Sequence, residues 1–414
     1  MKDTLKKPEV MAPVGSFAAL TAAIEAGANS VYFGVQQLNM RARSAANFTL
    51  DDLREIAKTC NDAGVRTYLT VNTVLYDHDL TLMRAIIDTA KEANVTAIIA
   101  QDMAAILYAN KIGMTIHIST QLSISNYEGV KFYSQFADTI VLAREVDLDS
   151  IAAICKKIKE EDLRGPAGEL VKIEIFVHGA LCIAQSGRCQ MSLLQSNTSA
   201  QRGACLHECR KKYEVKDMET GHELRIRDNY IMSPKDLCSL PFLDKLIESG
   251  VAVLKIEGRG RSPQYVDVVV RVYREARDAI FAKEFTEKKK KEWMKQLGTV
   301  YNRGFCDGYY LGKPLPEWSG YSKNRSTDER IFVGRVTHYF PKVGIAEISV
   351  DAQKFKKGDH LVIMGNTTGV MYVDVEEVRQ DEESSKTVTI PVPDRVRLND
   401  KVYLVTKRNL DELD

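Results

Sequence analysis

Short apolar runs rich in β-branched residues alternate with amphipathic stretches from Glu9 to about Ala282. This alternation is typical of parallel strands joined by crossover helices. Seven of the runs are followed directly by a plausible helix, such as 17–26, 50–63 or 262–282. The eight predicted strands are Glu9–Ala12, Ser30–Gly34, Arg66–Val71, Thr96–Ala100, Thr115–Ser119, Thr139–Ala143, Lys172–His178 and Val251–Glu257.

Eight such units favour a closed (β/α)8, TIM-like barrel of the α/β class over an open doubly wound sheet, and we assign it to residues 1–282. The exception to the pattern is a long excursion between the seventh and eighth strands, at about residues 179–250. An insertion after a barrel strand emerges at the C-terminal face, where barrel enzymes place their chemistry. The excursion is therefore the first place to look for a functional site.

The pattern changes after the barrel. The charged stretch 283–295 predicts a solvated helix face rather than an RNA-binding patch, because acidic residues interrupt its lysines. Residues 301–323 are rich in glycine, proline and aromatic residues, so 283–329 is expected to be a helical and irregular connector. From Arg330 onward, short alternating runs predict a small all-β barrel domain over residues 330–414.

The composition indicates a folded protein without a general attraction for polyanions. Hydrophobic residues make up 44% and charged residues 27% of the 414-residue chain, which is typical of a globular enzyme with a large core. The 57 Lys and Arg residues nearly cancel the 56 Asp and Glu residues, so an RNA partner would need a local patch. No signal-like or membrane-spanning apolar run is visible, so we expect a cytoplasmic protein without a membrane partner.

The cysteines are the most informative residues of the excursion. In a reducing compartment, clustered cysteines are better interpreted as metal ligands or redox groups than as disulfides. Zinc usually takes two tight pairs of ligands, and only two of these cysteines are spaced that way, so the spacing favours an iron–sulfur cluster over zinc. An iron–sulfur cluster needs four thiolate ligands, so one of the five cysteines would not be a ligand. The five cysteines are Cys182, Cys189, Cys205, Cys209 and Cys238.

The excursion and its surroundings resemble a known family. The runs EIFVHGALCIAQSGRCQMS, RGACLHECR and SPKDLC resemble the signature of the peptidase U32 family, and the N-terminal MAPVGSFAALTAAIEAGANSVYFG extends the resemblance over essentially the whole chain. Members were first labelled collagenase-like proteases. The better understood branches are oxygen-independent hydroxylases with a 4Fe-4S cluster, which act on tRNA uridine, on ribosomal RNA cytidine or in ubiquinone biosynthesis.

The resemblance implies a ligand set and a reaction. By motif, the cluster ligands would be Cys182, Cys189, Cys205 and Cys238, and Cys209 would not be counted among them. The single-chain length and the C-terminal β domain are most similar to the tRNA branch. That branch implies hydroxylation of the wobble uridine to 5-hydroxyuridine, with prephenate as the small-molecule hydroxyl donor.

Polar residues at the ends of the predicted strands are candidates for catalysis, because barrel chemistry lies at strand C-termini. The arginines among them offer bidentate contacts to carboxylates or phosphates. The alternative for the charged residues is a set of structural ion pairs at the rim. The histidine is equally a candidate core residue. The proposed catalytic residues are Arg144, Glu145, His178, Glu257 and Arg259, and the further rim positions are Asn72, Gln101, Asp102 and Gln121.

Basic residues near the same face are candidates for RNA contacts. One pair follows the second strand, and the others flank the cysteines, which supplies local positive charge in a nearly neutral protein. An anticodon loop presents its wobble base already unstacked, as such an enzyme would require. The candidate RNA-contacting residues are Arg41, Arg43, Arg202, Arg210, Lys211 and Lys212.

The leading hypothesis is thus an iron–sulfur-dependent hydroxylase acting on tRNA. The alternatives are a U32-type peptidase, a hydroxylase of ribosomal RNA, and a non-catalytic RNA-binding factor with a structural cluster. The peptidase is disfavoured because the sequence contains neither a G-x-S-x-G elbow nor an H-E-x-x-H helix. Nothing in the sequence indicates the oligomeric state.

Overall fold

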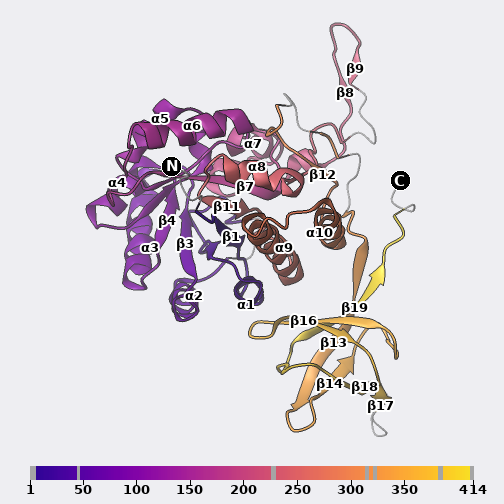
Figure 1. The fold of residues 1–414 in the computed structure, drawn as a ribbon. Coiled ribbons are helices and arrows are strands. Elements are labelled where there is room, and N and C mark those ends of the chain that lie inside the picture. The colour runs from indigo at the N-terminus through magenta and orange to yellow at the C-terminus, as the bar shows by residue number, and fades with distance from the viewer. Residues whose placement is uncertain are drawn as a thin grey trace.

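The chain forms a closed barrel of eight parallel strands (Figure 1). The computed structural model describes residues 6–43, 47–224, 230–312, 317–319, 324–380 and 386–410. β11 pairs with both β1 and β7, and this closes the ring and confirms the predicted (β/α)8 architecture. The barrel strands are β1 (Glu9–Pro13), β2 (Ser30–Phe33), β3 (Arg66–Val71), β4 (Ala97–Ala100), β5 (Ile116–Ile118), β6 (Thr139–Val141), β7 (Lys172–Ala180) and β11 (Val253–Ile256).

Helices cover the outside of the barrel (Figure 1). They bury an apolar stripe against strands that are themselves buried on both faces, as a parallel sheet requires. Local signals fix where they begin: Thr49 and Asp52 form a reciprocal capping box at the start of α2. The barrel helices are α1 (Phe17–Glu25), α2 (Leu50–Asp62), α3 (Leu80–Glu92), α4 (Met103–Lys111), α5 (Tyr127–Ser134), α6 (Leu148–Glu160), α8 (Leu243–Glu248) and α9 (Pro263–Phe281).

The predicted excursion lies between β7 and α8. It contains the short helix α7 (Met191–Ser196) and the hairpin of β8 (Val215–Lys216) and β9 (Glu223–Leu224), which projects away from the barrel in Figure 1. It then returns as β10 (Asp236–Cys238), which pairs antiparallel with β7. The end of the predicted segment is the seventh crossover helix, α8, so the excursion proper is shorter than 179–250.

The segment after α9 contains one helix and one short strand in its described part. The lysine-rich stretch is helix α10 (Glu287–Thr299), which buries Trp293 and Leu297. The glycine-rich stretch contributes β12 (Phe305–Cys306), which pairs parallel with β10 and extends the barrel sheet.

The C-terminal part is all-β, as predicted. Its seven strands form one antiparallel sheet in the order β16-β15-β19-β13-β14-β18-β17. Tyr372 of this sheet donates a hydrogen bond to Asp267 of α9 at 3.2 Å, and this contact joins the sheet to the barrel. The strands are β13 (Asp328–Phe340), β14 (Ile345–Val350), β15 (His360–Gly365), β16 (Gly369–Asp374), β17 (Arg379–Gln380), β18 (Thr387–Pro391) and β19 (Lys401–Lys407).

Across the described ranges, the helices are all too short or too polar to span a membrane.

Candidate active site

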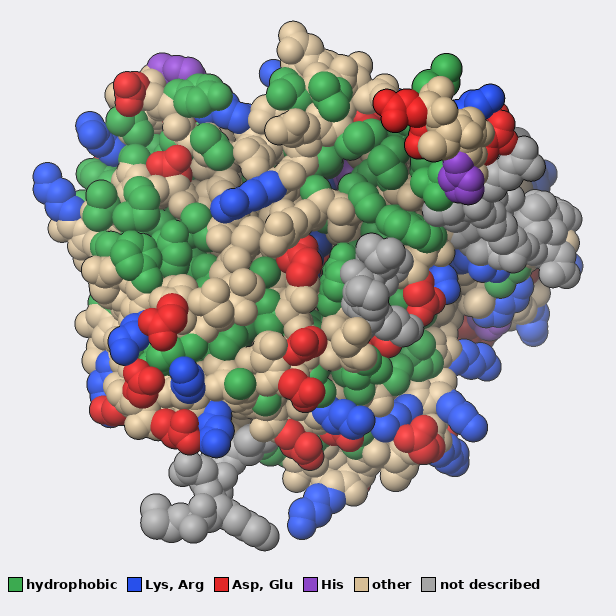
Figure 2. All heavy atoms as spheres, turned by 90° about the horizontal axis from the view of Figure 1, so that it is seen from above, with side chains coloured by type: hydrophobic (Ala, Val, Ile, Leu, Met, Phe, Trp, Pro, Cys, Tyr) green, Lys and Arg blue, Asp and Glu red, His purple; other side chains and the backbone are tan. Residues whose placement is uncertain are grey.

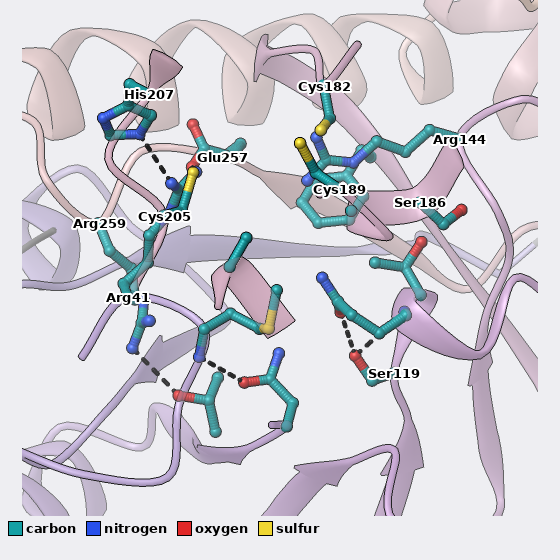
Figure 3. Close-up of a pocket in the computed structure, with 18 of the residues that line it drawn as sticks. Arg41, Ser119, Arg144, Cys182, Ser186, Cys189, Cys205, His207, Glu257 and Arg259 are labelled. Carbon is teal, nitrogen blue, oxygen red and sulfur yellow. Dashed lines mark hydrogen bonds and ion pairs between the residues drawn. The ribbon is translucent and has the colours of Figure 1, made fainter. Parts of the chain in front are cut away.

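A pocket lies at the C-terminal end of the barrel, and we call it the cysteine pocket (Figure 3). Its walls come from the ends of the barrel strands and from the excursion after β7. Parallel strands bring their carboxyl ends to one face, so residues far apart in the sequence meet here. The strand-end residues that line it include Tyr32, Thr70, Asn72, Ile99, Ser119, Gln121, Arg144, Phe176, Lys255, Glu257 and Arg259.

Four cysteines line this pocket: Cys182, Cys189, Cys205 and Cys209. They come from three places along the excursion: just after β7, just before α7, and the loop between α7 and β8. In Figure 3 the sulfurs of Cys182 and Cys189 lie together on one side, and Cys205 lies across from them. Burial raises the pKa of the Cys209 thiol to about 11, and the neighbouring thiols add to this effect.

The fourth cysteine of the expected set, Cys238, does not join the other three. β10 sets Cys238 opposite His178, and its sulfur lies 3.8 Å from the hydroxyl of Tyr273 and 3.7 Å from the sulfur of Met294. It is buried against α9 and α10 rather than in the pocket. The four thiols that the pocket collects therefore differ from the four that the resemblance implies, because Cys209 takes the place of Cys238.

The chemistry of the four thiols fits a soft, multi-atom metal core. In the part of the chain that the structure describes, no three His, Cys, Asp or Glu side chains are grouped closely enough to hold a single metal ion. An iron–sulfur cube is wider than one ion, so its four thiolates are spread around a larger space. Cysteine sulfur is the preferred ligand for such a core.

One ion pair spans the pocket wall. Arg41, in the loop after β2, donates a hydrogen bond to Glu257 at 3.1 Å and a second one to Nε2 of His207 at 2.9 Å. Burial alone would raise the pKa of Glu257, but the positive charges of Arg41 and its neighbours outweigh it and lower that pKa to about 2. The contact links the second strand loop, β11 and the loop between Cys205 and Cys209.

The five proposed catalytic residues separate into two groups. Arg144, Glu257 and Arg259 line the cysteine pocket. Glu145 instead accepts hydrogen bonds from the backbone and the hydroxyl of Ser186, at 2.8 and 2.9 Å, and so holds the loop between two of the cysteines.

His178 belongs to the second group. It is buried, with Nδ1 3.4 Å from the hydroxyl of Tyr273 and its ring beside Tyr265 and Phe305. Burial lowers the pKa of His178 to about 3, which keeps the ring neutral. The structure places it in the core behind the pocket, which agrees with the alternative interpretation of this residue.

Most of the predicted RNA-contacting residues have structural partners. Arg202 forms an ion pair with Asp79 at 2.5 Å. Arg210 donates to the carbonyl of Leu181 at 2.5 Å and to that of Pro234 at 2.8 Å, so it ties the segments around Cys182 and Cys209 together. These two arginines stabilise the pocket from behind and do not present their charge to a ligand.

The remaining basic candidates lie at the surface. Arg43 and Lys212 are exposed, and Lys211 is exposed but paired with Glu208. On the face shown in Figure 2, basic, acidic and apolar side chains are interspersed, in keeping with the net charge of +1. Any polyanion contact by Arg43 and Lys212 would therefore be local.

Many lining residues of the pocket were not among the candidates from the sequence, and Tyr32 and Lys255 are two of them. Lys255 is buried in β11 and its Nζ lies 2.6 Å from Glu174, which also contacts His117 at 2.9 Å. The available signal was a lysine inside an otherwise apolar strand, since such a residue is rarely buried without a partner.

Comparison with known proteins gives the family. Peptidase family U32 matches residues 15–320. A protein named collagenase from Porphyromonas gingivalis is 51% identical over 406 residues, which are 97% of this chain and 98% of that protein. A tRNA hydroxylation protein from Bacillus subtilis is 31% identical over 87% of this chain and 84% of its own length.

A third relative, a 23S rRNA 5-hydroxycytidine synthase from Escherichia coli, is 36% identical over 66% of this chain and 39% of its own length. The match to the family extends over most of the barrel and the whole cysteine-bearing excursion. We therefore conclude that this chain is a member of peptidase family U32, an enzyme family that includes proteins named for RNA hydroxylation.

Proposed function

We propose that this chain is an iron–sulfur-dependent hydroxylase that forms 5-hydroxyuridine at the wobble position of tRNA, with prephenate as the hydroxyl donor. The observation that carries the proposal is the convergence of four thiols on one pocket at the catalytic end of a barrel. The relatives named for tRNA and rRNA hydroxylation support it. Cytoplasmic tRNA would be the partner.

In this proposal Cys182, Cys189, Cys205 and Cys209 hold a 4Fe-4S cluster, with zinc as the less favoured occupant. A bound cluster would supply redox-active iron beside the substrate. The excursion shields the cysteine pocket from solvent. The ion pair between Arg41 and Glu257 holds one wall of the pocket in place. Arg144, Lys255 and Arg259 supply positive charge to its lining.

The test is a deletion strain in which 5-hydroxyuridine and its derivatives in bulk tRNA are measured by mass spectrometry. We expect these nucleosides to disappear, to return with the wild-type gene, and not to return with Cys182→Ser. Unchanged levels in a strain without a second homologue would reject the proposal. Loss of 5-hydroxycytidine from ribosomal RNA instead would favour the ribosomal alternative.

A peptidase is the second candidate, because the relative at 51% identity is named collagenase. Peptide hydrolysis needs a nucleophile beside a base or a metal-bound water. Among the described residues, the side-chain hydrogen bonds of His178 and His207 are with Tyr273 and Arg41, and neither is with a serine or cysteine. Hydrolysis of gelatin by the purified protein, with loss on His207→Gln, would favour the peptidase. A cluster-free variant that still binds tRNA but leaves it unmodified would count against a purely RNA-binding role.

A further inference from the structure

An exposed tyrosine lies at the rim of the cysteine pocket. Tyr76 is in the loop after β3, and 56% of its surface is exposed. The same loop begins with Asn72, which lines the pocket. Val74 of this loop donates a backbone hydrogen bond to the carbonyl of Gln201 at 3.1 Å, and the preceding residue, Ala200, lines the pocket too. Tyr76 is therefore held just outside the pocket lining.

The position of the Tyr76 ring is fixed from behind. The guanidinium carbon of Arg202 lies 4.3 Å from the centre of the ring. Arg202 itself donates to the carbonyl of Val74 at 3.1 Å and to Asp79 at 2.5 Å. Asp79 also accepts a hydrogen bond from the backbone N–H of Tyr76 at 2.8 Å. An exposed ring that is already ordered loses little entropy when a ligand docks on its remaining surface.

A second aromatic ring extends this surface. The ring of His78 lies 5.7 Å from that of Tyr76, and its side chain is 70% exposed. Asp77, between them in the sequence, is exposed as well, and its negative charge disfavours a phosphate at this point. A flat, uncharged π-system fits better. A nucleobase is such a group, and bases stack on aromatic side chains with little regard to their identity.

A basic side chain is held to the same part of the excursion. The backbone N–H of Arg43 donates to the carbonyl of Gly203 at 3.0 Å, and Gly203 is the neighbour of Arg202. The side chain of Arg43 is exposed. Residues 201–203 thus connect two loops, one with a cation and one with an aromatic ring. Sites for single-stranded nucleic acid combine these two features, a positive charge for the backbone and aromatic rings for the bases.

We infer that Tyr76, together with His78, is a stacking platform for an unpaired RNA base at the rim of the cysteine pocket, and that Arg43 contacts the RNA backbone beside it. The inference rests on the proposed function, in which RNA is the substrate, and names the residues that hold the nucleotide next to the target. A target base that enters the pocket leaves its neighbour at the mouth. Stacking of that neighbour on Tyr76 would stabilise the splayed arrangement.

Fluorescence anisotropy with the full-length protein tests the inference. The probe is a fluorescein-labelled RNA hairpin with a uridine in its loop. Tyr76→Ala should weaken binding about tenfold, as expected for the loss of one stacked base. The slope of log affinity against log salt should stay unchanged, because no charge is removed. Tyr76→Trp should retain the affinity. Phe132→Ala is the matched control, since it removes a ring of α5 that is 55% exposed, and it should bind like the wild type.

Two further probes identify the contact as stacking. One hairpin lacks the base on the 5′ side of the uridine, and the other lacks the base on the 3′ side. One of them should bind the wild-type protein about tenfold more weakly than the intact hairpin. Tyr76→Ala should not weaken the binding of that probe further, because the same contact is already absent. Arg43→Gln, by contrast, should weaken the binding of every probe and reduce the salt slope.

Unchanged affinity of Tyr76→Ala for the intact hairpin would overturn the inference and leave the ring available to a protein partner instead. It would also be overturned if the effects of Tyr76→Ala and of base removal multiplied for both abasic probes, or if a fully paired RNA duplex showed the same loss. A wild-type salt slope in Arg43→Gln would overturn the backbone contact. Should Tyr76→Ala fail to fold, judged by circular dichroism, Tyr76→Leu takes its place, since leucine keeps bulk but has no π-face.

The hairpin assay measures binding and needs no turnover. Modification is measured separately, in the deletion strain. Loss of the hydroxylase proposal with the expected hairpin results would leave an RNA subsite without that reaction. Confirmed modification with a hairpin affinity that is independent of Tyr76 would leave the hydroxylase without this subsite.

Discussion

The sulfur of Cys238 lies 3.8 Å from the hydroxyl of Tyr273, outside the cysteine pocket and its four thiols. This places Cys238 among the side chains of α9 and α10. Cys209, which the motif resemblance set aside, lines the pocket instead.

The first prediction concerns these two cysteines. Cys209→Ser and Cys182→Ser should each lose most of the iron and sulfide of anaerobically purified protein, because serine is a poor ligand for a soft metal core. Cys238→Ser should retain both, since its thiol faces Tyr273 and Met294. Iron and sulfide analysis with an absorption spectrum decides. If only Cys238→Ser lost iron and sulfide, the cysteines that line the pocket would not be the cluster ligands.

Substitution of Arg210 should lower the stability of the protein and leave its affinity for RNA unchanged. Its guanidinium joins the carbonyls of Leu181 and Pro234. Arg210→Gln should therefore lower the free energy of unfolding by about 1–3 kcal/mol, because buried carbonyl groups lose their donor. Chemical denaturation measures the effect, with the exposed Lys212→Gln as the matched control. A stable Arg210→Gln protein with weakened tRNA binding would contradict this assignment.

Substitution of the exposed residues Arg43 and Lys212 should change tRNA affinity and leave stability unchanged. Arg43→Gln and Lys212→Gln should each weaken tRNA binding and reduce the slope of log affinity against log salt by about one or less, with unchanged stability. Arg202→Gln should destabilise the protein instead, because it breaks the ion pair with Asp79. Filter binding at several salt concentrations, together with thermal melts, separates these outcomes. Salt slopes that equal the wild-type slope in both surface variants would exclude them from the RNA interface.

His178 predicts a pH dependence of stability. Burial lowers its pKa to about 3 in the folded protein, below the ordinary value near 6.5. The folded state therefore binds fewer protons than the unfolded state between these values. Its contribution to stability is present above about pH 6.5 and is lost progressively as the pH falls toward 3.

The measurement is the free energy of unfolding at pH 7.5 and pH 5. The wild-type protein should lose up to about 2 kcal/mol more than His178→Gln over this interval, at roughly 1.4 kcal/mol per pH unit below 6.5. If both proteins lose the same amount, His178 is not a buried neutral group. Equal slopes with greatly reduced stability of His178→Gln would instead indicate a packing role alone.

Local sequence pattern determined the larger features of this protein. Buried parallel strands have to be apolar on both faces, and their helices have to be amphipathic, so eight strands and most of the helices could be located from the periodicity. The position of the cysteines directly after the seventh strand likewise predicts that they lie at the catalytic face of the barrel. Arg144, Glu257 and Arg259 follow from the same rule about strand ends.

Tertiary structure decided which of these residues meet. Spacing along the chain does not show that β10 turns back beside β7 and carries Cys238 away from the pocket, or that Cys209 lines it. It also does not distinguish Arg210, which donates to backbone carbonyls and does not line the pocket, from Arg259, which lines it. Such distinctions depend on contacts between segments far apart in the sequence, and the path of the intervening loops sets them.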